Sequence, residues 1–346
     1  MGELPVNLVL MKTTVLCWGD IARVALDGVS VEEAQAAAER WCGAIQPDLV
    51  GEKVVTLGLE VPQPGKTAWG PHPARIRIGM RGGSGGEVPE LRIGPHAVVM
   101  GSGVESDQVR YSTRKTPSVF ERDLLVDLGI NHLLARQGLP VLHSCAFELC
   151  GSSVLGLGES FGGKTTVSVA AMRAGGRVAS DDVVLVVPDG DGLYSLLPVR
   201  SYGWLRGRTR EIVPDELRDK MAENQENGLP RWVLNREDAA GNFVDRIEPD
   251  VIWVQSVDRR LKESRIEPIN QGQVFAALIR ASSPLYLSRH CPEIRDRLIP
   301  VFQQLCAQCR GYRVRLAPRL LEDPVGEMER LVDLSRLGSS DPNYEL

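Results

Sequence analysis

The chain has 346 residues, 43% of them hydrophobic and 25% charged, and its formal net charge is −5. These values are ordinary for a globular protein, and the small negative charge gives no general attraction to nucleic acid or anionic membrane. No stretch approaches the roughly 20 apolar residues that span a bilayer, no secretory signal pattern is present, and the seven cysteines are scattered, so we expect a cytoplasmic protein with no nucleic-acid or membrane partner.

Short strands and turns fill the first third of the chain. They run from Val6 to Tyr111, with one amphipathic helix expected at Val31–Ile45. The run Arg81–Gly86 reads RGGSGG, which predicts a flexible loop between strands. We therefore expect a strand-rich α+β accessory domain over residues 1–115, a second domain over 116–336 and a flexible tail over 337–346.

A helix is expected to join the two domains. Ser118 and Glu121 have the spacing of a capping box, and the helical pattern continues to about Gln137. Its apolar positions include Leu124, Leu125, Leu128, Leu133 and Leu134.

A strand is expected next at 142–149, followed by a tight turn at Cys150–Gly151 and a second strand at 153–157. A hairpin of this length would return His143 to the end of the second strand. A histidine at a strand start is also compatible with a packed or solvated role, and spacing alone does not separate the two.

The segment Gly158–Thr165 reads GESFGGKT, which fits the G-x-x-x-x-G-K-T pattern of a phosphate-binding loop. The strand before it and the helical pattern at 166–172 give the context that this motif requires. Backbone N–H groups of such a loop face phosphate, and the helix dipole adds to them. Lys164 is expected to reach the outer phosphates and Thr165 to hold Mg²⁺. The alternative is a glycine-rich turn that carries Lys-Thr by coincidence.

The expected nucleotide-binding residues are Gly158, Glu159, Ser160, Phe161, Gly162, Gly163, Lys164, Thr165 and Thr166.

Two adjacent acids, Asp181 and Asp182, stand directly before the apolar run 183–187. If both meet the phosphates, this strand starts at the nucleotide, and we expect it to run opposite to the strand that feeds the loop, in a mixed sheet. Adjacent carboxylates can supply a metal partner and a base for an incoming hydroxyl. A capped surface turn is the alternative.

In this order, the histidine strand, the loop and the acidic pair resemble the core of HPr kinase/phosphorylase and its relatives. These are bacterial kinases with a core distantly similar to that of phosphoenolpyruvate carboxykinase. The resemblance is strong over 142–187 and weaker at 265–279, a strand followed by a helix, and at 312–316, a late strand. It implies an α/β fold, with a P-loop core around a mixed sheet, that binds ATP and Mg²⁺.

The resemblance also implies roles for individual residues. Asp181 corresponds to the base toward a seryl hydroxyl, and Lys164 to the residue that binds phosphates. Thr165 and Asp182 correspond to the Mg²⁺ ligands, and His143 lies close to the reacting centre.

The sequence departs from the family pattern in three places, and these departures concern the phosphate acceptor more than the phosphoryl-transfer chemistry. Phe161 stands where the family usually has glycine, Gly176 replaces a histidine, and the E-I-R-G-L-G segment of true HPr kinases is not recognisable. We expect a kinase that phosphorylates a serine of a peptide or protein. Free serine or another small molecule as acceptor, and a non-catalytic nucleotide-binding module, stay open, as does homo-oligomerisation.

A basic segment stands roughly where that family signature would be. Its cations, Arg200, Arg206, Arg208 and Arg210, fit either a solvated face or a mobile loop that binds phosphate or an acidic acceptor.

One imidazole and three thiol groups in the last 60 residues could form a zinc site: His290, Cys291, Cys306 and Cys309. A helical face favours a core position for Cys309 instead. That face consists of Ile294, Leu298, Val301, Phe302, Leu305 and Cys309.

Overall fold

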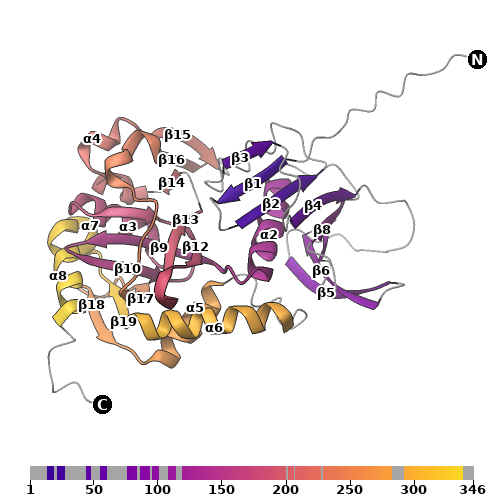
Figure 1. Cartoon of the computed structure of the whole chain (residues 1–346). Helices are drawn as coiled ribbons and strands as arrows, with labels where there is room; N and C mark the ends of the chain where they lie inside the picture. The colour runs from indigo at the N-terminus through magenta and orange to yellow at the C-terminus, as the bar shows by residue number, and fades with distance from the viewer. Residues whose placement is uncertain are drawn as a thin grey trace, which may run out of the picture. The chain divides into compact units, whose positions relative to one another are not determined.

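The computed structural model describes eight strands between Thr14 and Thr113, and residues 119–337 except 200–201, 206, 227–228 and 283–291. The chain divides into two compact units, residues 1–39 with 43–134 and residues 40–42 with 135–346 (Figure 1). The boundary falls within helix α2, Val119–Arg136, which is the helix expected from the capping-box pattern.

The first unit contains a mixed eight-stranded sheet in the order β3-β1-β2-β4-β8-β7-β6-β5. Strand β4 runs parallel to β2 and β8, and the other pairs are antiparallel. The strands are β1 (Thr14–Trp18), β2 (Ala22–Asp27), β3 (Ala44–Pro47), β4 (Val55–Glu60), β5 (Ile76–Gly83), β6 (Gly86–Ile93), β7 (His96–Met100) and β8 (Gln108–Thr113).

One expectation for this unit is corrected, and a second concerns residues of which the structure describes only the last two. The glycine-rich run 81–86 is mainly strand, because β5 and β6 pair down to Gly83 opposite Gly86 and the ladder outweighs the low strand propensity of glycine. The helix expected at Val31–Ile45 lies outside the described residues up to position 43. Its last two residues, Ala44 and Ile45, belong to β3, where they pair with β1.

The second unit is built on another mixed sheet, in the order β13-β12-β9-β10-β17-β19-β18, with β11 also paired to β9. Strand β17 is parallel to β10 and β19, whereas β9 and β18 are antiparallel to their neighbours β10 and β19. The strands are β9 (Val141–Leu149), β10 (Ser152–Leu157), β11 (Arg177–Ser180), β12 (Val183–Pro188), β13 (Tyr194–Pro198), β17 (Val251–Val257), β18 (Arg265–Pro268) and β19 (Arg310–Leu316).

Helices cover both faces of this sheet (Figure 1). Helices α3 (Lys164–Arg173), α7 (Arg319–Glu322) and α8 (Pro324–Leu337) pack on one face, and α5 (Gln271–Ala281) and α6 (Pro292–Gln308) pack on the other. Successive side chains of a strand point to opposite faces of the sheet, so each strand contributes to both cores. Val251 and Trp253 of β17 lie in the core on the α3 side, and Ile252 lies in the core on the α5 side. Within the α3 side, the Trp253 indole donates to the Ser335 hydroxyl at 3.0 Å.

Several sequence predictions for this unit are confirmed. Asn270 caps α5 in a capping box with Gln273 after the expected strand β18. The apolar face expected on α6 is buried, and Cys309 lies in the same core, where its Sγ contacts the Pro249 carbonyl oxygen at 3.2 Å. His290 and Cys291 lie outside the described residues, as does the tail after Leu337, the last residue of α8.

The acidic pair Asp181-Asp182 lies between two strands that continue one another. Both β11 and β12 pair antiparallel with β9, which is itself antiparallel to β10. Strand β12 therefore runs in the same direction as β10, and the expectation of opposite directions is wrong. The reason is the short strand β11, which precedes the acidic pair: it starts opposite Glu148, near the hairpin turn, and runs along the edge of β9 away from β10 to the level of the loop, where β12 continues in the same direction.

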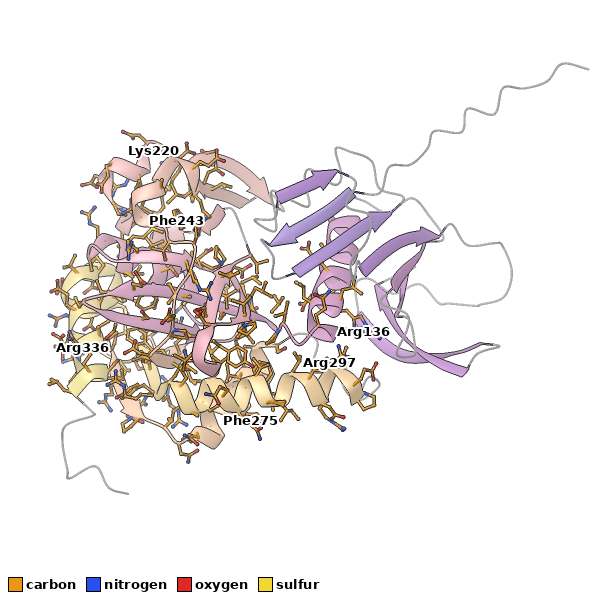
Figure 2. All side chains as sticks on the ribbon, in the orientation of Figure 1. Arg136, Lys220, Phe243, Phe275, Arg297 and Arg336 are labelled. Atoms are coloured by element: carbon orange, nitrogen blue, oxygen red, sulfur yellow. The ribbon has the colours of Figure 1, made fainter. Side chains whose placement is uncertain are left out.

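A small three-stranded sheet packs beside α3. Its order is β14-β16-β15, and its core residues Leu205 and Leu234 join the cluster that contains Val167 of α3. Nearby, the Arg236 guanidinium lies 4.8 Å from the centre of the Phe243 ring, which is labelled in Figure 2. The elements of this region are β14 (Tyr202–Leu205), η2 (Gly207–Ile212), α4 (Asp215–Arg218), β15 (Ala222–Glu226), β16 (Leu229–Asn235) and η3 (Glu237–Asn242), and η1 (Gly190–Gly192) closes the β12–β13 turn.

Within the described part of the chain, every helix is too short or too polar to cross a membrane.

Candidate active site

The expected phosphate-binding loop connects β10, which ends at Leu157, to α3, which begins at Lys164. Gly163 precedes the helix with φ +88°, a left-handed conformation that glycine adopts without strain. Phe161 has φ +65° and its side chain is 87% exposed. A residue with a Cβ is strained in this conformation. This gives a physical reason why glycine is the expected residue where this chain has Phe161. The sequence motif thus has the strand–loop–helix geometry predicted for it.

Lys164 is buried at the first position of α3. Its ammonium group donates to the carbonyl oxygens of Gly158 at 2.8 Å and Glu159 at 3.0 Å. Burial lowers the pKa of Lys164 from its usual 10.5, and the nearby carboxylates of Asp182 and Asp181 act in the opposite direction. The acidic pair is therefore within electrostatic reach of the loop lysine.

Asp182 and His143 face each other across neighbouring strands. Val183 pairs with His143 in the sheet, and the His143 Nδ1 lies 3.1 Å from Asp182 Oδ1. Both side chains are about 40% exposed, so the pair is open to solvent. The hairpin β9–β10 accordingly returns His143 to the loop end of the sheet, as its spacing predicted.

The small sheet lies against Asp181 and α3. A Cβ at Gly203 of β14 would lie 3.6 Å from the Asp181 carboxylate, and the Thr209 hydroxyl of η2 lies 3.1 Å from that of Thr166. The Arg210 guanidinium lies 4.7 Å from the centre of the Trp232 ring, a cation–π distance. Of the basic run, Arg208 pairs with Glu211 on the surface, and Arg200 and Arg206 lie outside the described residues.

A buried layer under the loop was not anticipated from the sequence. It consists of Cys145 on β9, Gly156 on β10 and Gln255 on β17, which lie on the face that α3 covers. A Cβ at Gly156 would collide with the Cys145 sulfur and the Gln255 amide oxygen. Gln255 lies within β17, after the apolar residues 251–254, and no sequence motif surrounds it. Only the strand register therefore reveals its position.

The oxygen donors here suit magnesium. Among the described residues no cluster of three or more metal-ligating side chains occurs. Mg²⁺ needs no such cluster, because it keeps several waters and takes one or two carboxylates together with substrate phosphates. The partly exposed Asp182 carboxylate and the Thr165 hydroxyl are donors of this kind.

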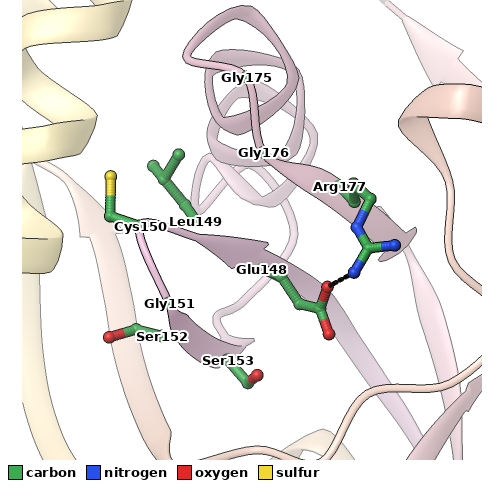
Figure 3. A pocket seen from close by; sticks show the side chains of 9 residues that line it. All are labelled: Glu148, Leu149, Cys150, Gly151, Ser152, Ser153, Gly175, Gly176 and Arg177. Atoms are coloured by element: carbon green, nitrogen blue, oxygen red, sulfur yellow. Dashed lines mark hydrogen bonds and ion pairs between the residues drawn. The ribbon is translucent and has the colours of Figure 1, made fainter.

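A separate pocket of about 380 Å³ opens at the other end of the β9–β10 hairpin (Figure 3). Glu148 and Arg177 pair across it at 2.6 Å, and Cys150 with Gly151 forms the hairpin turn at its edge. None of the expected site residues lines this pocket, so it is distinct from the loop.

Sequence similarity to a known protein extends over about half of this chain. No family model matches the chain. The HPr kinase/phosphorylase of Mycoplasmopsis pulmonis (strain UAB CTIP) is 26% identical over 183 residues, which cover 51% of this chain and 58% of that protein. The structure of the Hpr(Ser) kinase/phosphatase from Coxiella burnetii aligns over 58% of this chain and 99% of its own, with a TM-score of 0.30 and 13% identity. In sequence the chain is therefore similar to an HPr kinase/phosphorylase, and it spans less than two thirds of the length of that relative.

Proposed function

We propose that this chain is an ATP-dependent kinase that transfers the γ-phosphoryl group to a hydroxyl, that of a serine in a peptide or protein. The observation that supports the proposal is that the loop and the acidic pair lie at the same end of the sheet: Leu157, the last residue before the loop, pairs with Ser144, whose N–H donates to the Asp182 carbonyl oxygen at 2.8 Å. The relative named HPr kinase/phosphorylase supports this class of chemistry. A module that only binds nucleotide has no use for a second carboxylate.

In the proposed reaction, the loop and the acidic pair have separate roles. The serine Oγ attacks the γ-phosphorus, the bond from phosphorus to the β–γ bridging oxygen breaks, and ADP leaves with that electron pair. Asp181 accepts the hydroxyl proton as the new oxygen–phosphorus bond forms. Lys164 and the loop N–H groups hold the negative charge on the phosphates.

Thr165 and Asp182 are the residues that would hold Mg²⁺, which neutralises phosphate charge when bound. His143 then has a positioning role: with a proton on Nδ1, it donates to Asp182 across 3.1 Å and limits the rotation of that carboxylate.

The two carboxylates give the most direct test. Asp181→Asn removes the base and should lower the rate of phosphoryl transfer by about 10²- to 10⁴-fold while Mg-ATP still binds. Lys164→Ala should weaken nucleotide binding and turnover together. Full transfer by Asp181→Asn with normal ATP binding would show that the base has been assigned to the wrong residue.

The acceptor is the second part of the proposal. The mixed sheet of the first unit has two edge strands, β3 and β5, on which a peptide can add as a strand, and this is more surface than a small metabolite requires. The experiment is to incubate the protein with Mg-ATP and either free serine, HPr or small peptides encoded beside its gene, and to identify phosphorylated products by mass spectrometry. Turnover of free serine far above any peptide would refute the peptide acceptor and leave the kinase intact.

A further inference from the structure

Gln255 touches the phosphate-binding loop from beneath. It is 3% exposed, and its amide Nε2 donates to the carbonyl oxygen of Gly162 at 3.3 Å. Its backbone oxygen also closely approaches the loop start, because a Cβ at Gly158 would lie only 2.9 Å from it. Strand β17 thus contacts both ends of the loop through one residue.

The other side of the Gln255 amide faces a buried thiol. The Cys145 Sγ lies 3.9 Å from Gln255 Oε1, a weak sulfur contact, and is completely buried. Burial raises the pKa of this thiol to about 12, so it stays protonated near neutral pH, and its one hydrogen has the Gly156 carbonyl oxygen at 3.6 Å and Oε1 at 3.9 Å as acceptors. With Oε1 turned to the thiol, the N–H groups of the amide face the loop.

Lys164 holds the same loop by a different and exchangeable set of bonds. Two of its three N–H donors point at the carbonyls of Gly158 and Glu159. Phosphate oxygens would compete for these donors, because a charged acceptor forms the stronger hydrogen bond. Gln255 has no such competing partner, since its amide is buried under the loop. Its bond to Gly162 can persist while Lys164 turns to phosphate.

We propose that Gln255 is a positioning residue that holds the phosphate-binding loop, through the Gly162 carbonyl, in the conformation that receives a nucleotide. This inference rests on the proposed function, because it concerns the same loop. The bond acts next to the tight turn in which the Gly162 N–H donates to the Glu159 carbonyl at 2.9 Å. It thereby limits the motion of the loop N–H groups that face phosphate, and a preorganised loop binds with a smaller entropy cost.

The test replaces the amide by a side chain of similar length. Gln255→Met removes the donor, and Gln308→Met is the matched control. Gln308 also donates to backbone carbonyls, at 2.9 Å to Tyr194 and 3.1 Å to Pro249, away from the loop. Affinity is measured with ADP that carries a fluorescent methylanthraniloyl group, in the presence of Mg²⁺. Hydrogen exchange of the peptide that contains the loop is measured by mass spectrometry without nucleotide.

We expect Gln255→Met to bind about threefold to tenfold more weakly, the range of one hydrogen bond, and to exchange its loop amides faster than wild type. Gln308→Met should keep wild-type affinity and loop exchange even if its melting temperature falls. If Gln255→Met does not fold, Gln255→Asn, which keeps the amide but shortens its reach, takes its place with the same expectation.

The outcomes separate the two proposals. If wild type binds the labelled ADP, Lys164→Ala weakens that binding, and Gln255→Met equals wild type in both measurements, then the role of Gln255 is wrong and the phosphate-binding loop stands. Equal losses in Gln255→Met and Gln308→Met would also overturn it, because a general loss of stability would then explain both. If wild type binds no nucleotide, the proposed function and this inference fail together.

Discussion

Burial of the Lys164 ammonium links the chemistry of the loop to the stability of the fold. Its folded-state pKa is lowered chiefly by desolvation. Below that lowered pKa the lysine is protonated in both folded and unfolded chains, and the full cost of burying the charge is present. As the pH rises toward 10.5, the folded form loses its proton while the unfolded form keeps it, so stability rises with pH.

We therefore expect the free energy of unfolding of wild type, relative to Lys164→Met, to increase as the pH rises through this window. Urea unfolding of both proteins at several pH values from neutral to about 10 measures the difference, and groups common to both chains cancel. A difference that is constant with pH, or that falls, would mean that Lys164 has no lowered pKa.

Phe161 is the strained residue of the same loop. Its left-handed φ costs about 1 to 2 kcal/mol for a side chain with a Cβ, and its 87% exposure means that little packing repays this. Phe161→Gly relieves the strain but enlarges the conformational freedom of the unfolded chain, an opposing effect of about 0.5 to 1 kcal/mol. We expect unfolding measurements to show Phe161→Gly as stable as wild type or up to about 1.5 kcal/mol more stable.

Phe161→Val supplies the contrast, because a β-branched residue tolerates this φ poorly. It should be less stable than Phe161→Gly. A clear loss of stability in Phe161→Gly would show instead that the ring packs against the protein.

At the scale of the element, strand β14 covers one side of the proposed base. A Cβ at Gly203 would lie at ordinary contact distance, 3.6 Å, from the Asp181 carboxylate, whereas the methyl groups of valine reach further. Gly203→Ala should keep most of the phosphoryl-transfer rate. Gly203→Val should lower kcat by about 10²-fold or more, since a displaced base loses its contribution, with nucleotide affinity within about twofold of wild type. An active Gly203→Val would argue that Asp181 has room to move or is not the base.

The sequence could predict those elements that depend on local patterns. Strand β10, the loop and α3 follow one another along the chain, so local patterns were sufficient to find them. The direction of β12 could not be predicted from local patterns, because it depends on β11, a four-residue strand that pairs with β9 directly before the acidic pair. Gln255 was missed for the same reason: it is remote from the loop in sequence, and only the pairing of β10 with β17 brings it under Gly162.

At the scale of the whole molecule, buried thiols can report whether the two faces of the second sheet unfold together. Cys145 lies under α3, and Cys306 and Cys309 lie in the core on the α5–α6 side. Burial raises the pKa of Cys145 to about 12 and of Cys306 to about 11, and raises that of Cys309 as well. Because the thiolate is the reactive form, these three should resist alkylation in the folded protein, whereas Cys150 is exposed.

We predict that short pulses of iodoacetamide at pH 8, followed by peptide mass spectrometry, label Cys150 without denaturant and label the three buried thiols only within the urea transition. One sheet carries both cores, so loss of its strand pairing removes protection from both faces at once, and their labelling midpoints should coincide with each other. Labelling of Cys306 and Cys309 at a lower urea concentration than Cys145 would contradict this. It would mean that α6 opens locally while the strands beneath the proposed phosphate-binding loop remain paired.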